Sequence, residues 1–179
     1  AVLQVSGLME AESRGSIGSA FAKEVMLGTA DLLKGMNVDL LGTGVGFTAG
    51  AMDLLHAGHV LMLKECREQC DYLIAGLEVD PSVDRPDKNK PVETLEERMI
   101  RLQGCKYIDE IVVYKDEVDL FHLLQKINPD VRFMGADWKN KSNYSKDRLP
   151  NMKVVYNSRD HGYSSSNLKQ RIIKGSNTS

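Results

Sequence analysis

The sequence is poor in cysteine, has no long apolar run and carries no excess of basic residues. Its three cysteines are an odd number without CxxC spacing, which argues against a disulfide framework and against a zinc site built from paired thiolates. Cys66 and Cys70 lie four residues apart in a segment with helical spacing, and we interpret them as small buried apolar residues. This cysteine usage predicts a reduced, cytoplasmic setting.

Charge is nearly balanced along the chain. Lys and Arg number 23, Asp and Glu number 25, and the formal net charge is -2. A protein that binds nucleic acid or a membrane surface would show a basic excess or a basic stripe, so neither partner is expected. No apolar run has membrane-spanning length, and the first residues lack the basic region and long apolar stretch of a signal peptide. Membrane insertion is therefore not expected, whereas a small anionic ligand is compatible with local basic residues.

Apolar segments with strand and helix character alternate through most of the chain. Continuous apolar strands separated by helices are typical of a parallel sheet that is covered on both faces. The sequence therefore predicts an α/β fold, a doubly wound, Rossmann-like parallel sheet of about five strands, in a single domain over residues 41–175. We expect strands within 38–49, 72–79, 110–114, 131–135 and 153–157, and helices within 59–70, 93–104, 118–127 and 164–173.

Residues 1–40 form a separate leader in this interpretation. Residues 20–36 show loose helical spacing that Gly28 and Thr29 weaken. The role of the leader is unknown, and we expect either a flexible segment or a cloning remnant.

Two of the four histidines, His56 and His59, stand where an expected strand gives way to an expected helix. Helix N-termini at the carboxyl ends of parallel strands present free N–H groups and a partial positive charge, which attract phosphate. Two imidazoles there would add donors to the phosphate, and Gly58 would let it approach the backbone. The pair could instead ligate a metal, although no third ligand stands at a familiar spacing, or could be a chance pair at a helix start.

A second pattern lies just upstream. Gly44 to Ala49 satisfies the dinucleotide-binding pattern G-x-G-x-x-A, which indicates a nicotinamide-dependent protein as a rival hypothesis. That pattern requires a helix to open at this point and an acidic residue about twenty positions later. The expected helix begins only near His59, and Glu78 comes late, so we give this pattern little weight.

Four segments together resemble a known family. Residues 50–59 read G-A-M-D-L-L-H-A-G-H, which resembles the signature G-T-F-D-L-L-H-x-G-H of the cytidylyltransferase-like nucleotidyltransferases. Three further segments follow in the family's order, namely Lys88–Lys90 with Glu97 and Arg98, then Met134–Trp138, then Arg159–Ser166. The last of these reads R-D-H-G-Y-S-S-S and resembles the family's R-T-E-G-I-S-T-T. The resemblance covers residues 44–173, and the branch it is most similar to is glycerol-3-phosphate cytidylyltransferase.

This resemblance implies an activity. The family transfers CMP from CTP to a phosphorylated small alcohol, here one like glycerol 3-phosphate, and releases pyrophosphate with Mg²⁺ as cofactor. No covalent enzyme intermediate is expected, so the protein would position the substrates and stabilise charge. An adenylyltransferase that uses ATP and a sugar phosphate is the alternative within the fold, and a nucleotide-binding module without catalysis is a third hypothesis. Family members are often dimers, which implies a homodimer.

The resemblance also implies roles for particular residues. The expected catalytic residues are His56, His59, Lys90 and Arg159. The expected nucleotide-binding residues are Ala51, Met52, Gly58, Lys88, Gly135, Asp137, Ser164, Ser165 and Ser166. Arg98 and Trp138 are expected at the acceptor, with the base pocket as a second place for Trp138, and the metal ligands remain unknown. Simpler interpretations stay open: a solvated loop for the lysines, helix capping for the serines, an exposed helix face for Arg98 and a packed core for Trp138.

Two departures bear on the acceptor. Lys106 stands where the glycerol-phosphate branch commonly has arginine, and Leu120 stands near a position at which that branch has a lysine for the acceptor phosphate. Both changes weaken the expectation of glycerol 3-phosphate and leave the nucleotide half of the motif set unchanged.

Overall fold

The computed structural model describes residues 44–176, in which five parallel strands form one sheet in the order β3-β2-β1-β4-β5. The strands are β1 (Val45–Gly50), β2 (Tyr72–Glu78), β3 (Glu110–Tyr114), β4 (Val131–Gly135) and β5 (Val154–Asn157). The helices are α3 (Ala57–Arg67), α4 (Leu95–Gln103), α5 (Glu117–Ile127), α6 (Tyr144–Arg148) and α7 (Ser165–Ser176), with short 3₁₀ turns η1 (Asp53–Leu55) and η2 (Ala136–Trp138).

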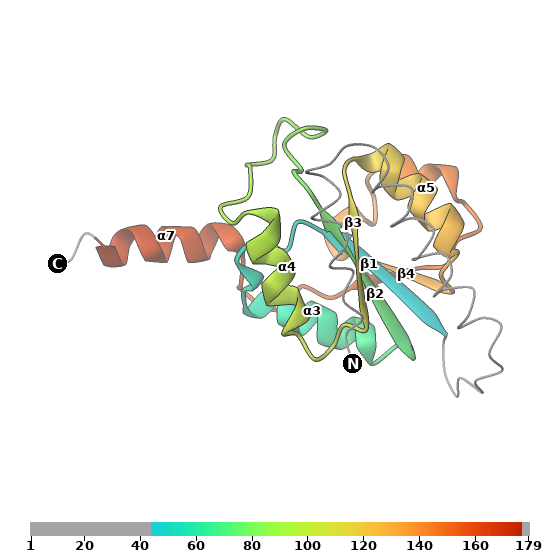
Figure 1. Cartoon of the computed structure of the whole chain (residues 1–179), viewed down its shortest axis with the longest axis horizontal. Coiled ribbons are helices and arrows are strands. Elements are labelled where there is room, and N and C mark those ends of the chain that lie inside the picture. Colours follow the sequence, from blue (N-terminus) through green and yellow to red (C-terminus); the bar gives the residue numbers. More distant parts are fainter. Residues whose placement is uncertain (1–43, 177–179) are drawn as a thin grey trace.

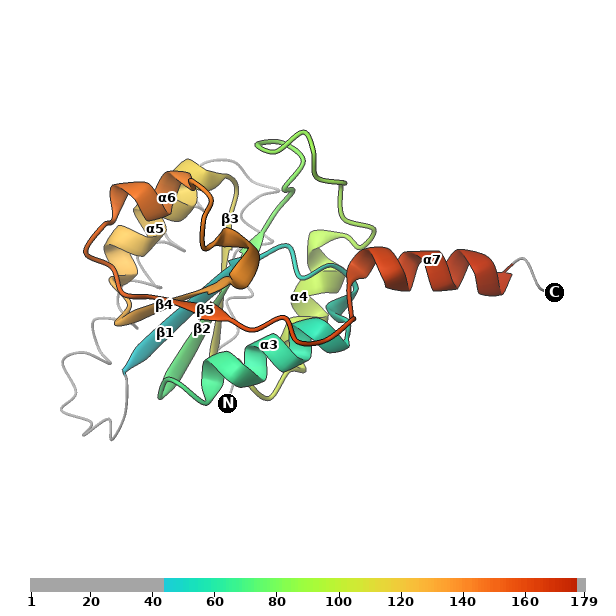
Figure 2. The same ribbon diagram turned by 180° about the vertical axis from the view of Figure 1, so that it is seen from behind.

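Helices cover both faces of this sheet, and each face has its own core (Figures 1 and 2). Side chains alternate along a strand, so β2 sends Leu73, Ala75 and Leu77 to one core and Ile74 to the other. The first core packs against α3 and α4, whereas the second packs against α5 and the residues that follow α6. The predicted doubly wound α/β fold is therefore confirmed.

The strand order reverses at β1, which pairs with β2 on one side and β4 on the other. Ligands of open parallel sheets bind beyond the carboxyl ends of the strands at such a switch point. The segment that leaves β1 there is the one that carries His56 and His59. The fold thus places the most distinctive residues of the sequence at its best ligand position.

Element boundaries differ from the sequence predictions in a few places. Helix α3 starts at Ala57 rather than near His59, because the side chain of His56 caps it. The turns η1 and η2 and the short helix α6 were not expected. Helix α7 begins at the cavity described below and projects from the body of the molecule (Figures 1 and 2), with none of its residues fully buried.

Some expectations fall on residues outside the described range. The leader 1–40, the loose helix 20–36 and the first residues of the predicted domain 41–175 belong to this group. Residues 44–176 contain no helix with the length and apolar character that a bilayer crossing requires.

Candidate functional site

A cavity of about 500 Å³ opens at the carboxyl ends of the strands. Its wall is built from the ends of β1, β2, β4 and β5, the start of α3, the loop before α4 and the segment that enters α7. Lys90 and Arg98 are the predicted site residues that do not line it. Those that do are His56, His59, Arg159, Ala51, Met52, Gly58, Lys88, Gly135, Asp137, Trp138, Ser164, Ser165 and Ser166.

The two histidines form a stacked pair at the N-terminus of α3. Their ring centroids are 3.9 Å apart and the ring planes differ by 22°. Nδ1 of His56 accepts a hydrogen bond from the backbone N–H of Gly58 at 3.1 Å, so the neutral ring carries its proton on Nε2. That nitrogen lies 3.1 Å from Oγ of Ser165, the first residue of α7. The pair therefore joins the start of α3 to the start of α7.

Burial keeps both imidazoles neutral. Desolvation, with a smaller contribution from the neighbouring His56, lowers the pKa of His59 to about 4. Desolvation also lowers the pKa of His56, with added repulsion from His161 and Arg159. Nδ1 of His59 is buried and makes no hydrogen bond. A neutral imidazole can donate one N–H to a phosphoryl oxygen, and an anion would favour protonation and a second donor.

The turn between β1 and α3 has a strained backbone. Met52, Leu54 and Leu55 adopt positive φ values of 50°, 64° and 28°, a region that side chains larger than glycine disfavour. Asp53 holds this turn, because its Oδ1 accepts the backbone N–H groups of Val92 and Glu93 at 3.0 and 3.1 Å. Strain of this kind persists only where the surroundings fix the backbone, and it is common in binding sites.

Asp53 also ties the turn to α7. Its Oδ2 lies 2.9 Å from Nζ of Lys169, which lines the cavity. Burial alone would raise the pKa of Asp53, but hydrogen bonds from Glu93, Lys169 and Val92 hold the pKa below its ordinary value. Through these contacts Asp53 braces the turn between β1 and α3. The sequence gave no signal for Lys169, which the fold brings to Asp53 from 116 positions away.

Arg98 lies beneath the site rather than in it. Its side chain is buried, and the guanidinium donates to the carbonyl oxygens of Ala51, Glu78 and Val79 at 2.9, 2.6 and 2.6 Å. A direct acceptor contact, as expected from the resemblance, does not fit this position. Arg98 instead binds together the chain segments that leave β1 and β2, a contact that positions the histidine turn.

A second cluster faces the histidines from β4 and β5. Nη1 of Arg159 lies 3.4 Å from Oδ1 of Asp137 across the cavity. A Cβ atom at Gly135 would meet that same oxygen at 2.5 Å, so glycine leaves room for the carboxylate. Ser164 caps α7 by accepting the N–H of Asn167 at 3.1 Å, as the simpler interpretation of the serines predicted. Cap and phosphate contacts are compatible, since both use a helix N-terminus.

The basic loop before α4 contributes unequally to the site. Lys88 and Asn89 line the cavity, whereas Lys90 is exposed and does not. Arg85, at the start of the same loop, does line it and forms an ion pair with Glu78. The sequence interpretation missed Arg85, because nothing in its neighbourhood marks it among several charged residues.

A third imidazole meets the histidine pair. His161 lines the cavity, and a Cβ atom at Gly58 would lie 2.8 Å from its Cε1 and 3.0 Å from Cε1 of His56. Glycine is therefore required between the two rings. Nδ1 of His161 is buried and makes no hydrogen bond. Because the family motif has glutamate at this position, the resemblance drew no attention to His161.

The glycine-rich pattern upstream belongs to the strand. A Cβ atom at Gly46 would meet Cys70 Sγ and Phe133 Cε2, each at 2.7 Å, so close packing accounts for this glycine. The chain stays extended through Gly50, and no helix opens at the pattern. Its glycines lie at the start of β1, away from the carboxyl end where a ligand would bind.

Within residues 44–176, the three cysteines form no disulfide and belong to no group of metal ligands. Cys66, Cys70 and Cys105 are buried and unpaired, in line with the apolar role expected for the first two. Within residues 44–176, no three His, Cys, Asp or Glu side chains are grouped so as to hold a metal ion.

Comparison with known proteins shows the family of this domain. A family described as cytidylyltransferase-like matches residues 47–173. The bifunctional protein HldE of Campylobacter concisus is 37% identical over 112 residues, which is 62% of this chain and 24% of that protein. HldE of Helicobacter hepaticus is 35% identical over 135 residues, 75% of this chain and 27% of that protein. The chain therefore spans about a quarter of the length of these relatives.

A solved structure shares the fold. The lipopolysaccharide core biosynthesis protein from Thermoplasma volcanium has a TM-score of 0.56 and 22% sequence identity, over 65% of this chain and 98% of that one. At this level of identity the match supports the architecture of the domain.

Proposed function

This chain belongs to the cytidylyltransferase-like family, and we propose that it transfers a nucleoside monophosphate from a nucleoside triphosphate to a phosphorylated small molecule. The observation that carries this proposal is the stacked pair of His56 and His59 at the N-terminus of α3, inside the cavity at the switch point of the sheet. Free helix N–H groups and imidazole donors at one place suit a triphosphate.

Nucleotidyl transfer requires the protein to position the two substrates and to stabilise the charge that develops on the leaving group. An oxygen of the acceptor phosphate attacks the α-phosphorus and forms a new P–O bond. The bond from the α-phosphorus to the oxygen that bridges to the β-phosphorus breaks, and pyrophosphate leaves with the electron pair. Negative charge grows on the leaving group, and donors fixed beside it lower the barrier.

The chain offers donors on several sides of such a triphosphate. His56 and His59 would contact its oxygens from α3, whereas Arg159 and Ser165 would contact them from the entry to α7. His161, placed against Gly58, would add a third imidazole on the same side. Lys88 would approach from the loop before α4. This loop and the entry to α7 line one cavity, so their donors can contact a single anion.

Mg²⁺ fits this arrangement as a partner of the substrate. It prefers few protein carboxylates and several phosphate or water oxygens, so the absence of a three-ligand group in residues 44–176 does not oppose it. Asp137, which lines the cavity, is the carboxylate we propose beside it. When bound, the cation would neutralise charge on the phosphates.

Two substrate pairs remain candidates. The motif resemblance favours CTP with a phosphorylated polyol. The two positions that would support glycerol 3-phosphate, however, lie away from the cavity. Leu120 is 1% exposed in the core, and Lys106 lines a separate pocket with Arg101 and Tyr107. Because neither residue lines the cavity, these two departures do not decide between the two substrate pairs.

A substrate screen tests the proposal. CTP and ATP should be crossed with glycerol, ethanolamine, choline and sugar phosphates, and pyrophosphate release measured. His56→Ala and His59→Ala should each lower turnover by about 10²–10³-fold, the usual cost of a lost oxyanion donor. His122→Ala is the matched control, because His122 is exposed on α5 and does not line the cavity. Full activity in His59→Ala would contradict the proposed role.

Normal triphosphate affinity without pyrophosphate release across the whole panel would instead indicate a binding module. A cytoplasmic setting and a homodimer remain predictions from the sequence.

A further inference from the structure

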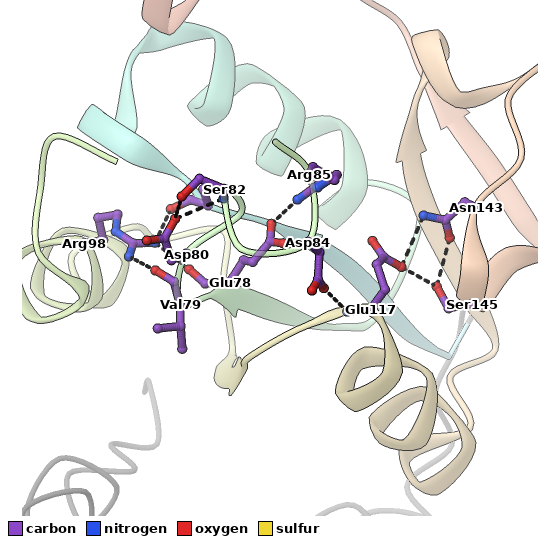
Figure 3. A network of polar contacts seen from close by, with 11 residues as sticks. Glu78, Val79, Asp80, Ser82, Asp84, Arg85, Arg98, Glu117, Asn143 and Ser145 are labelled. Carbon is purple, nitrogen blue, oxygen red and sulfur yellow. Dashed lines mark hydrogen bonds and ion pairs between the residues drawn. The ribbon is translucent and has the colours of Figure 1, made fainter. Parts of the chain in front are cut away.

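The wall of the cavity at the end of β2 carries an ion pair that the triphosphate does not need. Glu78 is the last residue of β2, is 1% exposed and lines the cavity. Arg85 lines the same wall, and its Nη2 is ion-paired with Oε2 of Glu78 (Figure 3). A buried carboxylate costs several kcal/mol to desolvate, roughly, unless its oxygens find partners.

This ion pair leaves one acceptor and one donor unused. Oε1 of Glu78 and Nε of Arg85 are both buried, and neither makes a hydrogen bond. The buried Tyr114 neighbours the carboxylate and helps to lower its pKa against the effect of burial, but completes no hydrogen bond to Oε1. Buried polar atoms are almost always paired, so two orphans on one ion pair in a cavity wall indicate a missing ligand.

The loop that carries Arg85 is held in place before any ligand binds. The side chain of Asp80 accepts from N and Oγ of Ser82 at 3.0 and 2.6 Å, which closes a turn after β2. Asp84 accepts the backbone N–H of Glu117, at the start of α5, at 2.8 Å (Figure 3). Arg85 is therefore presented to the cavity by a loop fixed at both the β2 and α5 sides.

The position of this wall separates it from most of the nucleotide contacts. The proposed triphosphate donors come from the end of β1 and from the entry to α7, except Lys88, which lies on the loop that carries Arg85; Trp138 follows β4. In the sheet order, β2 lies on the other side of β1 from β4 and β5. The aromatic Trp138 suits a nucleoside on the β4 side. The β2 side is thus left for the second substrate.

We propose that Glu78 and Arg85 bind two neighbouring hydroxyl groups of the phosphorylated acceptor, an inference that rests on the proposed nucleotidyl transfer. One hydroxyl donates to Oε1 of Glu78, and the next accepts from Nε of Arg85. A vicinal diol supplies this donor and acceptor at adjacent atoms. The subsite therefore selects polyol or sugar phosphates over choline phosphate, which has no hydroxyl on its alkyl chain and adds a cation that Arg85 would repel.

The test compares acceptors that differ by hydroxyl groups in the full chain. The probes are glycerol 3-phosphate against propyl phosphate, and glucose 1-phosphate against 2-deoxyglucose 1-phosphate, with kcat/KM measured by pyrophosphate release at saturating CTP or ATP. The wild type should prefer the hydroxylated member of at least one pair by about tenfold to a hundredfold, the usual penalty for leaving a buried polar group unpaired. Glu78→Gln and Arg85→Lys should each reduce that preference about tenfold or more, with KM for the triphosphate unchanged.

A matched control and a second variant keep the outcome clear. Asp87→Asn changes an exposed carboxylate to an amide in the same loop, outside the cavity, and should keep the hydroxyl preference. If Glu78→Gln fails to fold, Arg85→Lys carries the test. Pyrophosphate release in which both variants keep the wild-type preference, or change only the choice between CTP and ATP, overturns this inference and leaves the proposed function standing. No release with any pair overturns both.

Discussion

Burial sets the protonation state of the His59 imidazole. Its pKa lies near 4 because desolvation, and then His56, disfavour the charged ring. The unfolded chain takes up a proton at this residue below about pH 6.5, whereas the folded chain does so only near pH 4. The contribution of His59 to stability is therefore constant above the unfolded pKa and is lost as pH falls toward the folded pKa.

This difference gives a prediction for acid stability. When the pH is lowered from 7 to 5, protonation of His59 in the unfolded chain should reduce the unfolding free energy of the wild type by about 2 kcal/mol. His59→Asn should remove that loss, whereas His122→Asn, on the exposed side of α5, should retain it. Denaturant unfolding at both pH values measures the difference. Parallel pH dependence in wild type and His59→Asn would mean that His59 titrates normally in the folded protein.

His161 offers a comparison between imidazole and carboxylate at one position. The family motif has glutamate there, and this chain places His161 against Gly58 and the histidine pair. If His161 faces phosphate, His161→Glu should weaken triphosphate binding about tenfold or more, because a like charge at such range costs more than 1 kcal/mol, roughly. His161→Gln, which keeps a donor, should have a smaller effect. Calorimetric titration with CTP and ATP measures the affinity of each variant. Equal affinity in the wild type, His161→Glu and His161→Gln would show that His161 does not contact the triphosphate.

At the scale of elements, α4 shows how a motif can be matched and its role misjudged. Arg98 lies three residues after Leu95 and four before Leu102, on the helix face that packs against the sheet. Its guanidinium holds carbonyl groups that follow β1 and β2, so it acts on the histidine turn through the backbone. The sequence suggested an acceptor contact or an exposed helix face for Arg98, whereas the structure places its side chain on the buried face.

Arg98→Met tests this bracing role. Loss of the guanidinium would leave buried carbonyl groups unpaired, so unfolding free energy should fall by about 3 kcal/mol or more. Turnover should fall as well, because the turn that carries His56 loosens. Arg101→Met is the control on the same helix, where a side chain 54% exposed pairs with Glu93, and should cost about 1 kcal/mol or less. Wild-type stability with a raised acceptor KM in Arg98→Met would favour direct acceptor contact.

Much of the fold could be predicted from the sequence, because its strands are unambiguous. The apolar runs at β2, β3 and β4 are short, continuous and bounded by turns or helical spacing, and the structure places strands within one residue of the expected limits. Helix α4 follows from a Thr94–Glu97 capping box and Gly104. Helices and strands whose sequence pattern reflects local interactions were therefore predicted correctly.

The features that could not be predicted depend on contacts distant in sequence. Met52 and Leu54 adopt positive φ although their side chains disfavour it. The turn is held by hydrogen bonds that join Ala51, Asp53 and Leu54 to Glu93 and Arg98, about 40 or more residues later in the chain. No local preference encodes this. The same holds for the Glu78–Arg85 pair, whose unused atoms become visible only once the chain is folded around the cavity.

For the whole molecule, net charge conceals the character of the site. The chain carries a formal charge of -2, yet imidazoles, Arg159, Lys88 and Lys169 converge on one cavity. A total charge does not say where the individual charges lie, so it does not describe the local field in this cavity. A bound triphosphate should bridge α3, α7 and the loop before α4, and should therefore stabilise the molecule as a unit.

Thermal unfolding with ligands tests this at the level of the whole chain. A ligand at about one hundred times its Kd adds roughly 2.7 kcal/mol to the folded state, which for a chain of this size raises Tm by roughly 5–10 °C. CTP or ATP with Mg²⁺ should produce such a shift, and the double variant His56→Ala/His59→Ala should lose most of it. NAD should leave Tm unchanged, because the glycine pattern that suggested it lies inside β1. An NAD shift that persists in the double variant would restore the dinucleotide hypothesis, since that site would not use the histidines.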